Sequence, residues 1–262
     1  MQNKIIGICQ NLEEKENVRI LFAVENGSRA WRMASSDSDY DVRFVFARPI
    51  EDYIKSNMLD EVINVSFDCG GKPCCPKGAF IDVSGFDVFK YARLLYFSNP
   101  TAIEWITTDI VYYGAQNEVF RKFALKNFNK ISLYNHYKSL CRNNYMKYIK
   151  TGSDVTYKRY LYASRGLFNA RFVALRKTVP PIIFTDALND ISVLMPDAIL
   201  KKIYEIIKIK SQGKEKDKIK NIAELDEYIE DFLDESFEEQ SPGFTPPDEL
   251  DAELRRIVLS KF

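Results

Sequence analysis

The chain has 262 residues with 37 Lys/Arg, 37 Asp/Glu and 46% apolar residues, which is enough for one large folded domain or two modest ones. No stretch approaches the roughly 20 apolar residues of a membrane span, and acids follow the first short apolar patch where a signal peptide would stay hydrophobic, so we expect a cytoplasmic protein with no membrane partner. Five cysteines without disulfide or CxxC-pair spacing argue for a reducing compartment and against a zinc site.

The net charge of zero hides a strong segregation of charge along the chain. Residues 121–177 carry 14 Lys/Arg and one acid, Asp154, whereas residues 221–253 carry 13 acids and no Lys or Arg. Unbalanced charge destabilises a fold through self-repulsion and attracts partners of opposite sign. We therefore expect region 121–177 to contact a polyanion such as RNA, with a merely solvated helix face as the alternative. The sequence permits, without requiring, that the acidic region folds over these helices.

The first third of the chain alternates helices and strands. A helical segment at residues 11–16 leads to a buried strand at 18–24, and a short helix is expected at 29–34. Further strands are expected at 40–46, 62–67 and 79–83, and a helix from 86 to 97 that Asn99-Pro100 ends. Asp87 fits the cap of that helix.

Beyond residue 113 the apolar spacing is helical. Ser132 is the expected N-cap of one helix, and Gly152-Ser153 separates it from the next. In that next helix a core stripe is formed by Leu161, Ser164, Phe168, Phe172 and Leu175. The opposite face, expected to be polar and exposed, carries Lys158, Tyr162, Arg165, Asn169 and Arg176.

This pattern predicts an α/β (α+β) fold with three regions. A domain with a short mixed sheet and helices mainly on one side is expected at residues 1–112, and a basic helical domain at 113–212. An acidic C-terminal tail with short helices follows at 213–262.

The informative string runs from the first strand into the second. Gly27-Ser28 follows the strand directly and opens a helix, so backbone N–H groups and a hydroxyl can cradle a phosphate. Asp39 and Asp41 are two apart, so on a strand both carboxylates point the same way, with Arg43 on the same face. Two adjacent carboxylates are costly unless a cation neutralises them, and Mg²⁺ suits carboxylate oxygens together with substrate phosphates. An ordinary acidic turn is the alternative reading of Asp39 and Asp41.

Together these motifs resemble the signature of the polymerase-β nucleotidyltransferase superfamily: Gly-Ser, about ten residues, then Asp-x-Asp flanked by apolar residues. The fuller form GSRAW…SDYDVRF, followed by GFDVFKYARLL, SNP and Glu104-Trp105, is similar to a narrower group of the RlaP/YcgL type, associated with RNA repair. The resemblance covers roughly residues 20–180. At Arg32 the chain departs from it, because the family more often has glycine after the tryptophan.

The resemblance assigns expected roles to individual residues. Gly27, Ser28 and Arg29 would contact the triphosphate, and Asp39 and Asp41 would bind metal. The third carboxylate of the superfamily comes from a later strand. We expect this carboxylate to be Asp82, with Asp68 as the fallback, and expect it to bind metal and to orient or deprotonate the attacking hydroxyl. Further expected nucleotide-binding residues are Arg43, Lys158, Tyr162 and Arg165.

The implied enzyme is a nucleotidyltransferase that uses two Mg²⁺ ions, which Mn²⁺ can replace, and a nucleoside triphosphate, ATP being favoured. The hydroxyl acceptor would be an RNA end, in RNA repair or tRNA metabolism. Two alternatives remain: transfer of AMP to a protein hydroxyl, as in toxin–antitoxin relatives, and an RNA-binding module without activity. A module that had lost activity would be expected to lose Ser28 or one of the aspartates, and all are present.

Overall fold

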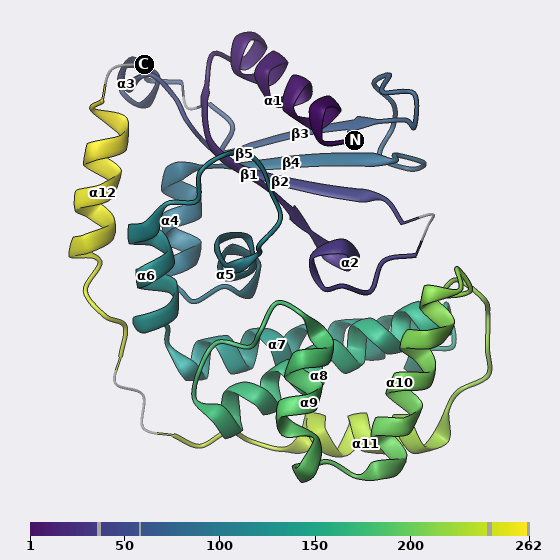
Figure 1. Cartoon of the computed structure of the whole chain (residues 1–262). Helices are drawn as coiled ribbons and strands as arrows, with labels where there is room; N and C mark the ends of the chain where they lie inside the picture. The colour runs from purple at the N-terminus through teal and green to yellow at the C-terminus, as the bar shows by residue number, and fades with distance from the viewer. Residues whose placement is uncertain (36–37, 58, 240–242, 261–262) are drawn as a thin grey trace. The chain divides into compact units, whose positions relative to one another are not determined.

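The chain forms two compact units, drawn in the computed structural model of Figure 1, which describes residues 1–35, 38–57, 59–239 and 243–260. The sheet unit comprises Met1–Ala30, Ser38–Phe128 and Phe244–Phe262. The helical unit comprises Trp31–Asp37 and Asn129–Gly243. The sheet unit thus extends beyond residue 112, the boundary expected from the sequence, and also includes the last segment of the chain.

The sheet unit is built on five strands in the order β3-β4-β2-β1-β5. Strands β2 and β4 are parallel and the other neighbours are antiparallel, so the sheet is mixed, which confirms the expected α+β class. The strands are β1 Arg19–Asn26, β2 Tyr40–Ala47, β3 Val62–Phe67, β4 Ile81–Asp87 and β5 Val111–Gly114. The helices are α1 Gln2–Glu16, α2 Gly27–Ala30, α3 Ile50–Tyr53, α4 Val88–Tyr96, α5 Pro100–Thr107, α6 Glu118–Lys126 and α12 Asp248–Val258.

Helices cover both faces of the sheet, α1 on one and α4 and α5 on the other (Figure 1). On the α1 side, Ile5, Cys9 and Leu12 pack against strand residues that include Val42 and Phe44. On the other side aromatic rings fill the space: Phe22 lies edge-on to Tyr91 at 5.7 Å, and Phe86 stacks on Trp105 at 4.4 Å. Alternation along β2 therefore points Asp41, Arg43 and Val45 away from the α1 side.

The first helix begins earlier than its sequence indicates. α1 spans Gln2–Glu16 and ends at Asn17, which adopts a left-handed conformation with φ of 49°. Its apolar run Ile5-Ile6-Gly7-Ile8-Cys9 reads as β-branched and strand-like, but burial of Ile5, Ile8 and Cys9 against the sheet outweighs that local preference. The sequence alone indicated only the last part of this helix.

The helical unit is an antiparallel helix pair with further helices around it. Its elements are α7 Lys130–Asn144, a π-helical turn Tyr145–Lys150, α8 Tyr157–Arg176, α9 Phe184–Ile191, a 3₁₀ turn Ser192–Leu194, α10 Asp197–Ser211 and α11 Ala223–Asp234. α7 and α8 approach closely at Gly166, where a β-carbon would lie 2.6 Å from the Cys141 amide nitrogen. The N-cap of α7 is Asn129, whose side chain accepts from Ser132 N, so Ser132 is not the cap that we expected.

α8 is buried on the face that the sequence marked as polar and exposed. Arg165 is 7% and Asn169 1% exposed, whereas Leu175 of the expected core stripe is 44% exposed. The expectation of a solvent-facing polar side is therefore wrong for Arg165 and Asn169. The pattern misled because a long helix surrounded by other helices buries most of its circumference, polar positions included.

Acids of the segment 223–239, here called the acidic segment, pair with basic side chains of α7 and α8 within the helical unit. Glu239 lies 3.1 Å from Lys130 and 2.9 Å from Lys177. Glu235 lies 2.6 Å from Arg171, and Glu230 pairs with Lys150. Four of the 14 basic side chains of region 121–177 are thus paired with the acidic segment, a contact that the sequence permitted but did not require.

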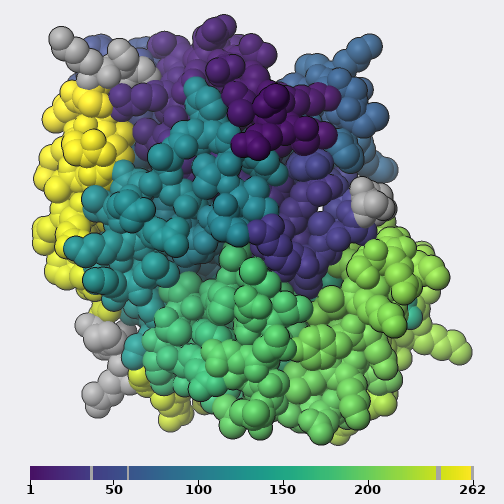
Figure 2. Space-filling view, viewed as in Figure 1, coloured from purple at the N-terminus to yellow at the C-terminus, as the bar shows by residue number. Residues whose placement is uncertain are grey.

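The last helix packs in the sheet unit. α12 lies on α4 and α6 and buries Leu250, Leu254, Ile257 and Val258. In Figure 2 this segment, in yellow, lies directly against the teal surface of α6. In the described part of the chain, no helix combines the length and apolar character that crossing a membrane requires.

Candidate active site

Asp41 and Asp82 lie side by side at one end of the parallel pair β2–β4. Asp41 is directly opposite Asp82 on one side and opposite Asn26 of β1 on the other. Both carboxylates are partly exposed, 32% for Asp41 and 39% for Asp82. The sheet register therefore brings together two acids that are 41 positions apart in the sequence, on strands identified from their apolar pattern.

Gly27 allows the chain to turn tightly beside these acids. It directly follows β1, has φ of +65°, and begins the one-turn helix α2. A β-carbon at Gly27 would lie 2.2 Å from Asp41 Oδ2, a distance at which atoms overlap. Ser28 follows as a largely buried residue. The Gly-Ser pair and the aspartate are thus in direct proximity, as their spacing led us to expect.

The guanidinium of Arg43 lies between the two carboxylates. Its Nη2 is 3.0 Å from Asp41 Oδ1 and 2.9 Å from Asp82 Oδ2, and its Nη1 donates to the carbonyl of Asp82 at 3.0 Å. Adjacent like charges repel, so this cation stabilises the pair. A positive group thus already lies where both carboxylates point.

The residues present fit a divalent cation. Carboxylate oxygens are the donors that Mg²⁺ takes from proteins, usually one or two of them together with substrate phosphates. The Oδ1 atom of Asn26, opposite Asp41, is buried without a hydrogen-bond partner among the described residues, so one more oxygen acceptor lies in the neighbouring strand. Asp41 and Asp82 are the side chains that would hold the ion.

Asp39 has a different environment from Asp41. It immediately precedes β2, which begins at Tyr40, and it is exposed. Its carbonyl accepts from Arg29 Nε at 3.1 Å, and the Arg29 guanidinium also stacks on Tyr40 at 3.8 Å. Within the described residues, no three His, Cys, Asp or Glu side chains form a cluster of metal-binding geometry. The participation of Asp39 as a metal ligand stays a prediction.

Glu25 is a functional candidate that the sequence reasoning missed. It is fully buried in β1, and its Oε1 accepts from the backbone amide of Asp41 at 2.8 Å. The Tyr112 hydroxyl donates to its other oxygen at 2.5 Å. Burial raises the pKa of Glu25 to about 7, partly offset by these two hydrogen bonds. The sequence does contain a signal for this residue, because Glu25 is a charged residue at the end of an apolar run and directly precedes Asn-Gly-Ser.

Three residues expected to bind nucleotide lie in the helical unit, where Tyr162 and Arg165 contact Trp31 and Lys158 lies near Tyr162. The Arg165 guanidinium stacks on the Trp31 ring at 3.7 Å, and Tyr162 meets the same ring edge-on at 5.6 Å. Lys158 lies 3.5 Å from a carboxylate oxygen of Glu215. These contacts give all three residues a packing role, and their role in nucleotide binding stays a prediction.

Two further expectations concern Arg32 and Asp68. Arg32 has φ of +58°, a conformation that glycine adopts without steric cost, which explains why glycine suits this position. Asp68 accepts the amide of Lys72 at 2.8 Å within a tight turn, and this hydrogen bond is the main cause that lowers its pKa. Asp68 is therefore occupied in the turn, which favours Asp82 as the third carboxylate.

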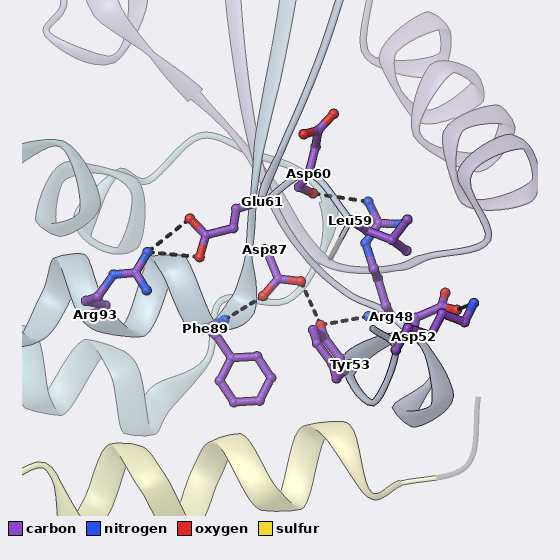
Figure 3. A pocket seen from close by; sticks show the side chains of 10 residues that line it. Arg48, Asp52, Tyr53, Leu59, Asp60, Glu61, Asp87, Phe89 and Arg93 are labelled. Atoms are coloured by element: carbon purple, nitrogen blue, oxygen red, sulfur yellow. Dashed lines mark hydrogen bonds and ion pairs between the residues drawn. The ribbon is translucent and has the colours of Figure 1, made fainter. Parts of the chain in front are cut away.

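A hollow of the sheet unit lies at the other end of β2 and β4. It has a volume of about 310 Å³ and surrounds Tyr53 and Asp87 (Figure 3). Asp87 is paired with Phe46, and Phe46 lies five residues after Asp41 along β2. Because a strand rises by about 3.3 Å per residue, Asp87 is about 16 Å from the pair Asp41 and Asp82.

Figure 3 shows that the polar groups of this hollow bind one another. Asp87 caps α4 through the amide of Phe89 at 2.9 Å and accepts from the Tyr53 hydroxyl at 2.7 Å. Arg93 contacts both oxygens of Glu61 at 2.9 and 3.0 Å. The cap expected at Asp87 is confirmed, and we assign this network to structure.

Comparisons with known proteins agree with this geometry. Residues 1–257 match the family RlaP, described as an RNA repair pathway DNA polymerase beta family. The chain is also 31% identical over 263 residues to an uncharacterized protein, YcgL, of Bacillus subtilis (strain 168). That alignment covers 99% of this chain and 96% of YcgL. The matches extend through both units, well beyond the strands that carry Asp41 and Asp82.

Proposed function

Because the chain belongs to the RlaP family, the RNA repair pathway DNA polymerase beta family, we propose that it is a metal-dependent nucleotidyltransferase acting on an RNA end. The family membership confirms the resemblance to the RlaP/YcgL type that the sequence motifs carry, and it supports this proposal. The observation that supports the proposal best is the convergence of Asp41 and Asp82 beside Gly27, with a cationic group between the two carboxylates.

The triphosphate of the nucleotide would bind at the turn from β1 into α2. Gly27 has no side chain to block the approach of a phosphate, and the Ser28 amide and hydroxyl can donate hydrogen bonds to it. Arg29 and Arg43 add positive charge close by. The Arg29 guanidinium is held by hydrogen bonds to the carbonyls of Ser38 and Asp39. The Arg43 guanidinium is held by its ion pairs with Asp41 and Asp82. ATP is the triphosphate that we favour.

The metal would be Mg²⁺, held by Asp41 and Asp82, with Asp39 as the further expected ligand. When bound, Mg²⁺ supplies positive charge to the phosphate oxygens and to the leaving oxygen. The oxygens of Asp41 and Asp82 now bonded to Arg43 are the ones that would turn to the ion. Arg43 would then be freed to pair with a phosphate, as its guanidinium geometry permits.

The reaction we propose is an in-line displacement at the α-phosphate. The acceptor hydroxyl oxygen forms a bond to the α-phosphorus while the bond from that phosphorus to the bridging oxygen breaks, and pyrophosphate leaves. Asp82 orients the attacking hydroxyl and accepts its proton. Glu25 positions Asp41 by accepting its backbone amide, and this contact makes Glu25 a positioning residue.

A labelling experiment tests this function and its alternatives together. Purified full-length protein is incubated with Mg²⁺, each α-labelled nucleoside triphosphate in turn, total RNA and total cell protein. The proposal predicts label in the RNA fraction, with pyrophosphate released in equal amount. Label in protein alone would point instead to protein modification. Absence of label with every triphosphate would contradict catalysis and leave a binding module.

A further inference from the structure

The surface of the helical unit is hollowed where α7 passes through the π-helical turn and meets the start of α8. The hollow has a volume of about 570 Å³, within the range of about 300–1,000 Å³ of small-molecule sites. It is lined by Asn143, Asn144, Met146, Lys147, Tyr148 and Arg159. All six belong to the helical unit, so the hollow exists without any contribution from the sheet unit. π-helical turns occur frequently at functional sites.

Neither cation of this hollow, Lys147 nor Arg159, is paired with a carboxylate of the acidic segment in the described part of the chain. Elsewhere on α7, the π-helical turn, α8 and the residue that follows α8, carboxylates of the acidic segment pair with Lys130, Lys150, Arg171 and Lys177. Lys147, by contrast, has no carboxylate partner among the described residues, and its ammonium lies 5.1 Å from the centre of the Tyr148 ring. The hollow is thus a part of the basic surface that the acidic segment leaves uncovered.

A stacked cation forms one wall of the hollow. The Arg159 guanidinium lies 3.6 Å from the centre of the Tyr148 ring, and its Nε donates to Asp154 at 2.8 Å. Stacking and this ion pair hold the guanidinium plane in place, while its terminal nitrogens have no partner among the described residues. A fixed guanidinium with open N–H groups matches the geometry of a phosphate.

Amide side chains form another wall. Asn143 is exposed, and Asn144 uses its Nδ2 to donate to the carbonyl of Leu140 at 2.9 Å, which directs its oxygen elsewhere. Asparagine amides both donate and accept, which suits the mixed edges of nucleobases. An acidic peptide would need cations alone, so the combination of two cations, an aromatic ring and two amides favours a polynucleotide. Unpaired bases with accessible edges are characteristic of single-stranded RNA recognition.

We propose that this hollow binds a single-stranded segment of RNA. Lys147 and Arg159 contact backbone phosphates, Asn143 and Asn144 contact base edges, and Tyr148 supports the cations. The inference rests on the proposed transfer to RNA, because it assigns a binding site to the acceptor. It replaces the buried Arg165 face with the hollow around Tyr148 as the RNA contact of the basic region.

The test measures RNA affinity in the absence of nucleotide, so that it does not depend on catalysis. A fluorescent single-stranded RNA of mixed sequence is titrated with full-length protein at several salt concentrations. Each phosphate contact adds about 0.7 to the slope of log affinity against log salt for single strands. Lys147→Ala should therefore lower the slope by about 0.7, and Lys147→Ala with Arg159→Ala by about 1.4.

Lys201→Ala is the matched control, since Lys201 is an exposed lysine on α10 outside the hollow. It should leave both affinity and slope unchanged. Asp154→Asn removes the negative charge beside Arg159, while the amide oxygen of asparagine can still accept from Arg159 Nε and keep the guanidinium in place, so this substitution should strengthen RNA binding. This gain of affinity cannot arise from misfolding.

Three results would overturn the assignment. They are an equal effect of Lys147→Ala and Lys201→Ala, no change with Asp154→Asn, and equal competition by an acidic peptide of matched charge. Transfer of label from the triphosphate is measured separately. If transfer fails while the slope changes as expected, the proposed reaction falls and the RNA site stands. If transfer occurs but the salt slope does not change in the variants, the proposed RNA site is wrong and the proposed reaction stands.

Discussion

At the residue scale, Gly27 sets how closely the backbone passes Asp41. A methyl group at this position would meet Asp41 Oδ2 at 2.2 Å, and φ of +65° disfavours a side chain. Gly27→Ala should therefore displace the Asp41 carboxylate, lower stability by about 1–2 kcal/mol and abolish nucleotide transfer. Thermal unfolding and the transfer assay measure the two effects.

Gly7→Ala is the matched control for this substitution. Gly7 lies in α1 with nothing within 4 Å of the added carbon, so helix propensity should raise stability by about 0.5–1 kcal/mol. If Gly27→Ala were as stable and as active as Gly7→Ala, the close approach of Gly27 to Asp41 would be wrong.

Arg165 illustrates how the structure changes an expected effect. An exposed arginine could be removed at almost no cost, but Arg165 is buried and stacks on Trp31 at 3.7 Å. Arg165→Ala should lower the free energy of unfolding by about 2 kcal/mol through loss of the stacking and of side-chain packing. Arg176→Ala on the same helix removes a partly exposed arginine paired with Asp190 and should cost about 0.5 kcal/mol. Urea unfolding compares them; equal costs would contradict the stacked geometry.

The residues of the candidate site were partly predictable from the sequence. Asp41 could be identified because the Gly-Ser pair precedes the Asp-x-Asp motif at the expected spacing, and Asp82 because the family resemblance implies a third carboxylate on a later strand. Glu25 also lies in an apolar strand but was overlooked because its partners, Asp41 N and Tyr112, come from other strands. The placement of Arg43 between the carboxylates depends on the parallel pairing of β2 with β4, which no local pattern specifies.

At the element scale, α4 is held at its start by Asp87. Burial is the largest cause that raises the pKa of this carboxyl, opposed by hydrogen bonds from Tyr53 and Phe89. A raised pKa means that the folded state binds the proton more tightly than the unfolded chain. This contribution to stability is therefore complete below the ordinary aspartate range and is lost as the pH rises through the raised value.

Asp87→Asn tests this linkage because asparagine can still cap α4 but does not titrate. The difference in unfolding free energy between wild type and Asp87→Asn should move in favour of wild type as the pH falls from 7 to 4. Denaturant unfolding at intermediate pH values measures it. A difference that stays constant, or moves in favour of the variant, would contradict a raised pKa at Asp87.

Elements were predicted best where local pattern and burial agree. β3 was expected at residues 62–67 and lies at Val62–Phe67, because its apolar alternation matches a half-buried strand. β5, only four residues long at Val111–Gly114, was missed because so short a run shows no clear periodicity, and its pairing with β1 defines it as a strand. The prediction of an exposed polar face on α8 was wrong because neighbouring helices cover polar side chains of that face.

At the scale of the whole molecule, the last helix belongs to the unit that contains the first strands. Leu254 of α12 is 9% exposed, whereas Leu259, just after the helix, is 70% exposed. Leu254→Ala should cost about 2–3 kcal/mol and lower the hydrogen-exchange protection of α4 and α6, with α7 and α8 unaffected. Leu259→Ala should change little. Equal loss of protection in α7 and α8 would contradict the assignment of α12 to the sheet unit.

The fold class of the whole molecule was predictable from the sequence. Which segments of the chain belong to which compact unit was not. Apolar patterns placed the α/β part first and the helices later. They could not show that residues 244–262 pack with the first unit, because that packing joins segments more than 100 residues apart. Apolar patterns also could not show that acids of the acidic segment pair with basic side chains of the helical unit, since charge complementarity alone does not specify a contact.

The assignment of the active site to Asp41 and Asp82 is tested most directly by comparing nucleotide transfer in two variants, Asp82→Asn and Asp68→Asn. Both substitutions remove one carboxylate at nearly constant shape, but Asp82 lies beside Asp41, and Asp68 holds a turn through Lys72 N. We predict that Asp82→Asn loses transfer by about 10³-fold while it still binds the triphosphate, and that Asp68→Asn stays near wild type. Wild-type transfer by Asp82→Asn, or an equal loss in Asp68→Asn, would contradict the assignment of the active site to Asp41 and Asp82.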